Sequence, residues 1–320
     1  MKKIFTLIAI CLAGQIMAQD STAAMKKDTT YWTKVGFIGL NASQTSVSDW
    51  SGGGQDNYAI NAVFNFEANY KKEKHEWTNK LDAQYGIIKT GSSRLFKKNI
   101  DQLFALSKYN INAFGKHWYY AAQVDYRTQF APGYKYSGDV IEGQAISDMN
   151  SPGYIQLALG LDYKPKDYFS ITIAPAAGKI TLVNRQYLAD AGAYDVEKAV
   201  YDENGVLITH GKKMRTEFGG RVIVKFKKDI FKNVNLDSYL DLFSNYGHNP
   251  GNIDVVFNNM LTVRLAKYFT VNIISQVLYD DDIIRKRDLD NDGLYDKPGE
   301  INGPRLQLMS TFAIGFGYKF

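Results

Sequence analysis

Apolar and polar side chains alternate at every second position over long stretches of the chain, the pattern of β-strands with one apolar and one polar face. In the clearest stretch, one face carries Tyr58, Ile60, Ala62, Phe64, Phe66, Ala68 and Tyr70. The other face of the same stretch carries Asn61, Asn65, Glu67 and Asn69. Such strands need an apolar medium on one side and a polar medium on the other.

This alternation predicts twelve strands, separated by polar or glycine-containing connections. They fall at residues 33–47, 57–70, 76–89, 99–113, 117–130, 153–164, 167–181, 214–227, 233–244, 252–266, 268–280 and 304–320. The fourth segment has apolar residues on both faces, so we expect a bulge or a shifted boundary in it.

The connections between these segments alternate in length. The longer ones are residues 48–56, 90–98, 131–152, 182–213, 245–251 and 281–303, and the shorter ones are 71–75, 114–116, 165–166, 228–232 and 267. Outer-membrane barrels have short periplasmic turns and longer extracellular loops. The sequence therefore predicts an all-β fold, a transmembrane antiparallel up-and-down β-barrel of about 12 strands over residues 33–320. The alternative fold is a soluble exported β-protein.

Both ends of the chain agree with export to the outer membrane. Residues 1–18 have a charged start, a short apolar stretch and a small residue at Ala18, the features of a cleaved signal peptide. A polar leader follows over residues 19–32. The last segment ends on Phe320 and resembles the sorting signal read by the barrel assembly machinery. The expected location is thus the outer membrane, and the expected partners are this machinery, membrane lipid and lipopolysaccharide.

Composition excludes several other classes of protein. The only cysteine is Cys11, inside the predicted signal peptide, so disulfides and thiol catalysis are excluded from the mature chain. Removing Lys2 and Lys3 lowers the formal net charge from +5 to +3, too weak a positive balance to suggest a nucleic-acid partner. The mean hydropathy of −0.29 is compatible with a barrel, because half of each strand faces water or a polar lumen.

Two stretches carry a family resemblance. The first is Leu40-Asn-Ala-Ser-Gln-Thr-Ser-Val-Ser-Asp-Trp-Ser-Gly-Gly-Gly54, and the second runs from Gly303-Pro-Arg-Leu-Gln307 to Gly315-Phe-Gly-Tyr-Lys-Phe320. They resemble a family of exported bacterial proteins known as domain of unknown function 3078. The resemblance implies an outer-membrane β-barrel of Gram-negative, Bacteroidota-type bacteria, with no assigned activity or substrate. It therefore supplies no catalytic residues.

The last long connection contains an acidic motif, Asp288-Leu-Asp290-Asn-Asp292-Gly-Leu-Tyr-Asp296. Alternating carboxylates followed by glycine can converge on Ca²⁺, which makes Asp288, Asp290, Asp292 and Asp296 candidate ligands. The twelfth position is Gly299 instead of the glutamate of an EF-hand, so the short aspartate repeats of extracellular proteins are the better comparison. The alternative is a solvated acidic loop. No other cofactor is expected.

The sequence contains no clear catalytic group. His75 and His117 fall in predicted turns, whereas His210 and His248 fall in predicted extracellular loops. His248 lacks the nearby serine of an outer-membrane phospholipase, and an omptin-like pairing with Asp241 or Asp254 has no specific spacing. We therefore expect a protein without enzymatic activity, with an outer-membrane hydrolase as the least favoured alternative.

The polar faces of the predicted strands should line the lumen. The charged residues on these faces are Glu67, Lys80, Asp82, Asp125, Arg127, Glu217, Arg221, Lys225, Asp237, Asp241, Asp254, Arg264 and Arg305. Acids and bases nearly balance, which favours ion pairs across the lumen over a filter of a single charge. Two functions remain open: a narrow solute channel or small-ligand-binding barrel, and a structural or docking barrel whose extracellular loops bind a partner or a surface glycan.

Overall fold

The computed structural model describes residues 31–45, 57–91, 93–266, 269–282, 284–287 and 301–319. Twelve long strands form one closed antiparallel barrel, in the ring order β1-β18-β15-β14-β13-β12-β9-β8-β5-β4-β3-β2. They are β1 (Trp32–Thr45), β2 (Asn57–Lys72), β3 (His75–Thr90), β4 (Lys97–Asn112), β5 (Trp118–Thr128), β8 (Gly153–Lys166), β9 (Phe169–Leu182), β12 (Met214–Phe231), β13 (Val234–Asn245), β14 (Ile253–Arg264), β15 (Phe269–Tyr279) and β18 (Gln307–Lys319).

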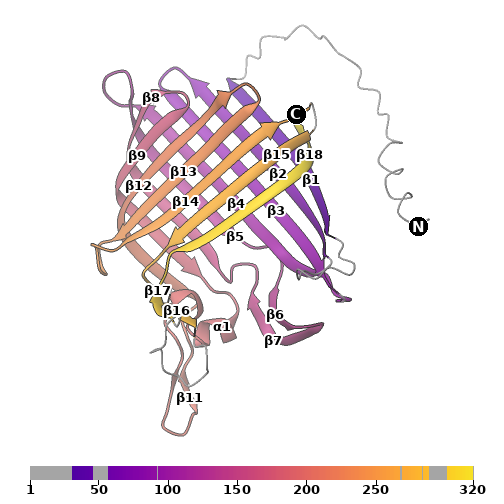
Figure 1. Ribbon diagram of the computed structural model, residues 1–320. Coiled ribbons are helices and arrows are strands. Elements are labelled where there is room, and N and C mark those ends of the chain that lie inside the picture. Colours follow the sequence, from indigo (N-terminus) through magenta and orange to yellow (C-terminus); the bar gives the residue numbers. More distant parts are fainter. Residues whose placement is uncertain are drawn as a thin grey trace, which may run out of the picture.

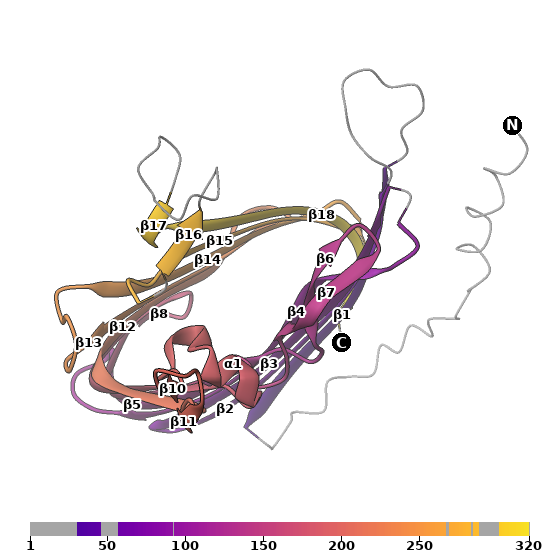
Figure 2. The ribbon, with the colours of Figure 1, turned by 90° about the horizontal axis from the view of Figure 1, so that it is seen from below.

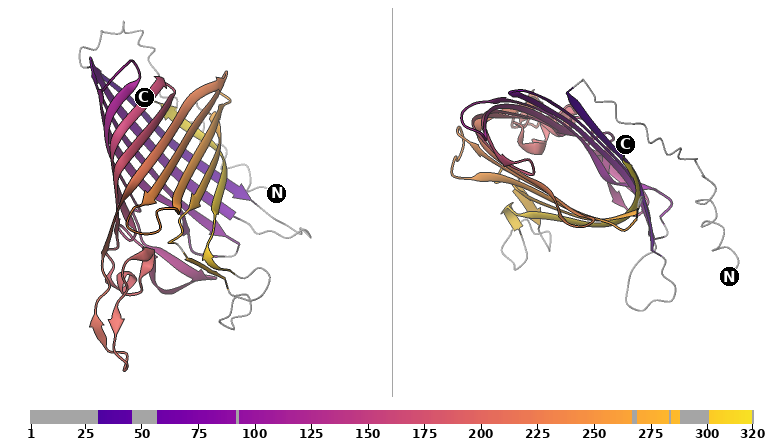
Figure 3. Two further views of the ribbon diagram at one scale, coloured as in Figure 1. Left: turned by 90° about the vertical axis from the view of Figure 1, so that its left-hand side faces the viewer. Right: turned by 90° about the horizontal axis from the view of Figure 1, so that it is seen from above.

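Each of these strands coincides with one of the twelve predicted segments, and each pairs with its neighbours in the chain. The strands slant across the barrel, and the ring is elongated in cross-section (Figures 1, 2 and 3). The predicted all-β up-and-down barrel is therefore confirmed. No helix in the described part of the chain is long and apolar enough to span a bilayer.

The long and short connections lie at opposite ends of the barrel, as their alternation predicts. The long connections carry small elements that the sequence did not predict: the hairpins β6–β7 (Gly133–Ser137 and Val140–Ser147), β10–β11 (Val200–Tyr201 and Leu207–Thr209) and β16–β17 (Ile284–Arg287 and Ile301–Pro304), the helix α1 (Gln186–Asp190) and the 3₁₀ turn η2 (Ala193–Asp195). All of them lie at one end of the barrel (Figure 1). These pieces are too short for their periodicity to stand out from loop sequence.

Aromatic side chains form a band around the outside of the barrel near the short turns. Trp32 contacts Tyr70 and Trp77, with ring centroids 5.3 and 5.6 Å apart. Farther round, Trp118 contacts Tyr163 at 4.8 Å. Apolar and aromatic side chains are exposed on the outer face of every barrel strand except β13, whose outward apolar side chains are half-buried; the exposed ones include Leu40, Ile60, Trp77, Tyr109, Tyr120, Leu159, Ile173, Phe218, Ile273 and Phe312. The outer surface is therefore an apolar belt with an aromatic band at one edge.

Two bulges interrupt the ladder within the barrel wall, and two further shifts of register lie beside the short turns, between Tyr163 and Lys166 and between Asp229 and Phe231. Gly86 pairs with Ile100 but Ile87 pairs with Lys98, which leaves Asn99 as an extra residue in the segment whose pattern was ambiguous. A second bulge lies in β9, where Pro175 pairs with neither neighbouring strand. Proline suits this position because it has no backbone N–H to donate to a neighbouring strand. Each bulge reverses the alternation of faces beyond it.

Several predictions concern residues outside the described part of the chain. These are the signal peptide, most of the polar leader, Phe320 and the candidate calcium ligands Asp288, Asp290, Asp292 and Asp296. Strand β1 begins at Trp32, one residue before the predicted first segment.

Candidate functional site in the barrel lumen

The barrel interior is identified by ion pairs between strands that are not neighbours in the ring, since such strands can meet only across the lumen. Arg221 of β12 is the clearest case. Its Nη1 lies 2.8 Å from Oδ1 of Asp125 on β5, and its Nη2 lies 2.6 Å from Oδ2 of Asp241 on β13. The Gln156 side-chain oxygen accepts a hydrogen bond of 3.0 Å from Nη2. One guanidinium therefore ties four strands together, and its side chain is 1% exposed.

A second buried group lies nearer the short turns. Lys108 of β4 reaches past β5 to Asp162 of β8, with Nζ and Oδ1 2.8 Å apart and the two side chains 5% and 0% exposed. Thr172 accepts a hydrogen bond from Lys108 and donates one to Asp162, each of 2.7 Å. In the same region Lys164 of β8 binds Glu76 of β3 at 2.7 Å. Opposite charges are thus paired along one curved side of the barrel, although Asn110 Oδ1, Gln123 Oε1 and Arg127 Nε are buried there without a hydrogen-bond partner among the described residues.

A third contact crosses the full width of the lumen. Lys227 of β12 lies 3.8 Å from Glu67 of β2, and the same Nζ lies 3.5 Å from Asp237 of β13. Strands β2 and β12 are six steps apart in either direction round the ring, so this contact joins opposite walls. The Lys227 and Glu67 side chains are 57% and 33% exposed, unlike the buried pairs. The lumen is narrow at this level but accessible to water.

At the loop end, Lys179 of β9 is surrounded by carboxylates. Its Nζ lies 2.8 Å from Asp254, 3.1 Å from Asp280 and 3.9 Å from Glu217. The β9 bulge places this lysine on the inside, because the strand's alternation changes sign at Pro175. The carbonyl oxygen of Pro175 accepts a hydrogen bond of 3.1 Å from the Tyr246 hydroxyl, which holds the bulge in place.

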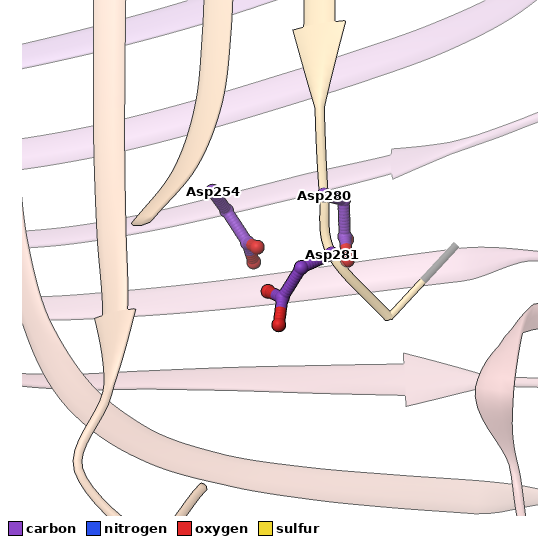
Figure 4. Close-up of side chains that lie close together, drawn as sticks. All are labelled: Asp254, Asp280 and Asp281. Atoms are coloured by element: carbon purple, nitrogen blue, oxygen red, sulfur yellow. The ribbon is translucent and has the colours of Figure 1, made fainter. Parts of the chain in front are cut away.

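Asp254, Asp280 and Asp281 form a compact acidic group beside this lysine (Figure 4), with carboxylate oxygens within 4.8 Å of one another. The Lys179 ammonium pairs with both Asp254 and Asp280, and Asp281 accepts a hydrogen bond of 2.6 Å from the Asn252 amide. The group is distinct from the acidic motif in which the sequence analysis placed a calcium site. One lysine thus faces three aspartates, so it offsets only part of the charge of the group.

The lumen face that continues from β14 through β15 and β1 to β2 carries uncharged amides between its charged residues. These are Asn258, Asn272, Gln276, Asn41, Asn61 and Asn65. On β14 and β15, the Thr262 hydroxyl donates to the side-chain oxygen of Asn272 at 2.8 Å. The lumen therefore has one ion-paired wall and one wall rich in amides.

The structure places most of the predicted lumen residues on inward-facing strand positions. These are Glu67, Lys80, Asp82, Asp125, Arg127, Glu217, Arg221, Lys225, Asp237, Asp241, Asp254 and Arg264, the last of them exposed at the short-turn rim. Arg305 is different: it precedes β18, which begins at Gln307, and it is exposed. The sequence pattern placed Arg305 within the twelfth strand, whereas the strand begins three residues later than predicted and Arg305 lies before it.

Sequence reasoning missed several inward charges, namely Glu76, Lys108, Asp162, Lys164, Lys179 and Lys227. Lys108 lies in the segment whose two faces could not be told apart, and Lys179 lies beyond an unrecognised bulge. The signal for the bulge is Pro175 itself, since proline inside a strand commonly marks one. For Lys227 the alternation was sufficient, because it lies two residues beyond the predicted Lys225.

The histidines lie outside this network. In the described structure His248 contacts Asn249 at 3.5 Å, and its candidate partners Asp241 and Asp254 bind Arg221 and Lys179 instead. The omptin-like pairing is therefore not formed.

Two long connections pack on each other beyond the loop end and form a cap. The Tyr187 and Tyr194 hydroxyls donate to the carbonyl oxygens of Ala145 and Ile146, at 2.8 and 2.7 Å. Arg185 binds Asp148. Burial opposes ionisation of Asp148, but hydrogen bonds from the Met149 N–H and from Arg185 outweigh it and lower the pKa of this carboxyl below its usual 3.8. The cap is thus held by neutral hydrogen bonds and one ion pair that persists at neutral pH.

A closed twelve-stranded barrel with an apolar exterior and an ion-paired lumen defines the class: an up-and-down β-barrel of the outer-membrane type. Within this class, residues 42–134 match the model of the family described as "Protein of unknown function (DUF3078)", in agreement with the resemblance seen in the sequence. No curated protein matches the chain.

The solved structures that the chain resembles are bacterial barrels. The COG4313 outer membrane channel from Pseudomonas putida F1 is 9% identical, with 90% of this chain and 95% of that chain covered and a TM-score of 0.39. The translocator domain of the autotransporter NalP from Neisseria meningitidis is 10% identical, with 92% and 91% covered and a TM-score of 0.35. Salmonella typhi OmpF in complex with daunomycin is 10% identical, with 90% and 97% covered and a TM-score of 0.27.

Proposed function

We propose that the protein spans the outer membrane and that its lumen is a narrow passage for small hydrophilic solutes. The apolar exterior with its aromatic band supports the location, because aromatic residues favour the membrane–water interface. The long connections then face outward and the short turns face the periplasm.

The observation that carries the passage is the contact between Glu67 and Lys227. It spans opposite walls, yet both side chains keep substantial exposure to water. The buried pairs around Arg221 and Lys108 brace one wall, whereas the amides of the other wall offer hydrogen bonds without net charge. Such a lining suits small uncharged polar solutes, because a filter for ions concentrates one sign of charge at its constriction.

Planar-bilayer recording of the purified protein tests this proposal. We expect small, stable conductance steps, and a larger conductance for the double variant Glu67→Gln/Lys227→Gln, which removes the attraction that draws opposite walls together. Lys71→Gln is the matched control: Lys71 lies at the same end, but its side chain is exposed and its partner Glu76 is on the neighbouring strand and not on the opposite wall. A barrel that shows no conductance, both as the wild type and as the double variant, would contradict the passage.

The second candidate is a docking barrel. The hairpins of the cap favour it, because they expose Val140, Ile141, Val206 and Ile208 at 46–66%. Two results together would support this alternative. The barrel would not conduct, and deletion of residues 199–209 would abolish binding of the cell to a surface ligand.

A further inference from the structure

Three carboxylates converge at the loop end of the lumen, where β14 begins and β15 ends (Figure 4). They belong to Asp254, Asp280 and Asp281, and one oxygen of each lies within 4.8 Å of an oxygen of the other two. Val255 and Tyr279 are the last pair in register between the two strands, so Asp254 and Asp280 lie across from each other just beyond the ladder. Like charges directly opposite each other on paired strands are destabilising. We call these three residues the aspartate group.

The cations of the protein offset only part of the negative charge in this region. Lys179 lies 2.8 Å from Asp254 and 3.1 Å from Asp280. The other cation is Arg215, whose carboxylate partners are Asp195, Glu217 and Asp282. With Asp281 included, two cations thus face six carboxylates among the described side chains of this region.

The aspartate group keeps carboxylate oxygens that receive no hydrogen bond. The Lys179 ammonium donates to Oδ2 of Asp254, and the Asn252 amide donates to Oδ2 of Asp281. Within the described part of the chain, no group donates to Oδ1 of either aspartate. The side chains of Asp254 and Asp280 are 17% and 19% exposed, so a solute at the mouth of the lumen can reach the group.

A buried oxygen without a hydrogen bond faces the aspartate group from β12. It is Oε2 of Glu217, which has no hydrogen-bond partner among the described residues although the side chain is only 3% exposed. The other oxygen, Oε1, accepts from Arg215 and Asn245 at 3.2 and 3.1 Å. Oε2 lies 3.9 Å from the same Lys179 ammonium that binds the aspartate group, which is beyond hydrogen-bond distance. A buried carboxylate oxygen without a donor is costly, and a bound ion or its water removes that cost.

We propose that the aspartate group binds a divalent metal cation, and that Ca²⁺ fits it best. The ligand atoms are carboxylate oxygens, which favour hard cations over the metals that prefer nitrogen or sulfur. Ca²⁺ accepts about six to eight oxygens in a flexible arrangement and takes some of them from water, whereas Mg²⁺ demands a near-ideal octahedron. Water on the cation also supplies the O–H donor that Oε2 of Glu217 lacks. The site is separate from the acidic motif between Asp288 and Asp296.

The cation joins parts of the loop end that belong to different segments. Asp254 belongs to β14, and Glu217 belongs to β12, on the other side of β13. Asp280 and Asp281 follow β15, where the last long connection begins. The bound ion therefore holds the start of this connection against the barrel rim. It stabilises the folded barrel more as its free concentration rises, because the unfolded chain does not bring the three carboxylates together.

Calorimetric titration of Ca²⁺ into the purified protein in detergent tests this proposal. The protein is first treated with a chelator and freed of lipopolysaccharide, whose phosphates bind Ca²⁺ themselves. Every sample carries Asp288→Asn, Asp290→Asn, Asp292→Asn and Asp296→Asn, so that the acidic motif contributes no binding. We expect this parent protein to bind one Ca²⁺ per chain, and to bind Mg²⁺ about tenfold more weakly or less.

The double variant Asp254→Asn/Asp281→Asn should weaken Ca²⁺ binding about tenfold or more, because two of the three charged ligands become neutral. Lys179 keeps its pair with Asp280 in this variant, so the barrel should stay folded, which its heat-modifiable migration checks. The matched control is Asp167→Asn, which removes an exposed carboxylate at the short-turn end and should bind Ca²⁺ as the parent does. Ca²⁺ should raise the unfolding temperature of the parent and of the control, but not that of the double variant.

Glu217→Gln is a second variant that keeps the shape of the side chain. It should weaken Ca²⁺ binding about tenfold, because the oxygen that faces the ion loses its charge. The proposal is overturned if the parent binds no Ca²⁺, or if folded variants of the aspartate group and of Glu217 bind it as tightly as the parent. None of these measurements involves conductance, so the result neither depends on the proposed passage nor decides it.

Discussion

At the scale of single residues, the stability of the barrel depends on buried charges that are paired with each other. The Lys108–Asp162 pair is almost completely buried, and Asp162 also lies 3.5 Å from Lys164, so it is removal of the Asp162 charge that leaves Lys108 without a counterion in a poorly solvated place. We expect Asp162→Asn to lower the free energy of unfolding by about 3 kcal/mol or more. Urea unfolding in detergent, followed by tryptophan fluorescence, measures this loss.

The control for Asp162→Asn is a lysine at the same end of the barrel whose own side chain is exposed. Lys71 is 69% exposed beside Glu76. Lys71→Gln should therefore change the free energy of unfolding by about 1 kcal/mol or less. Equal losses in the two variants would show that burial of Lys108 and Asp162 does not set their contribution.

At the scale of the strand, the β9 bulge decides which residues reach the lumen. Deleting Pro175 removes the extra residue of the bulge. The pairing of β9 with its neighbours can then stay in register only if the inward and outward side chains of one half of the strand exchange places. Lys179 would then point into the membrane, or the ladder would break. We expect the fraction of heat-modifiable, folded barrel to fall sharply, whereas deleting Gly205 in the exposed β10–β11 turn should leave that fraction unchanged.

The same bulge shows what the sequence can and cannot predict. Twelve strands could be predicted because alternation reports directly on the two media that a barrel strand separates, as in the stretch from Tyr58 to Tyr70. Cross-lumen partners such as Arg221 and Asp125 could be assigned to the interior but not to each other, since the elongated shape of the ring decides which walls meet. The bulge at Pro175 and the start of β18 after Arg305 depend on pairing with distant strands, which a local pattern does not contain.

At the scale of the whole molecule, the sorting of connections by length predicts an orientation. An epitope tag in the β10–β11 turn, at Gly205, should be detected by antibody on intact cells. The same tag at Gly115, in the short turn between β4 and β5, should be detected only after the outer membrane is permeabilised. Detection of both tags on intact cells would contradict the proposed orientation.

Neighbouring strands of the barrel differ in how many residues they pair. Only Phe37–Leu40 of β1 pairs with Phe316–Lys319 of β18 in the described residues, four pairs where every other seam has between ten and sixteen. Any breathing of the wall should therefore start as an unzipping of this seam from the loop end, where amide protons of β1 should exchange with solvent earliest. The pairing of β1 with β18, the first and last barrel strands in the chain, would then be the last to form on folding and the first to separate on unfolding.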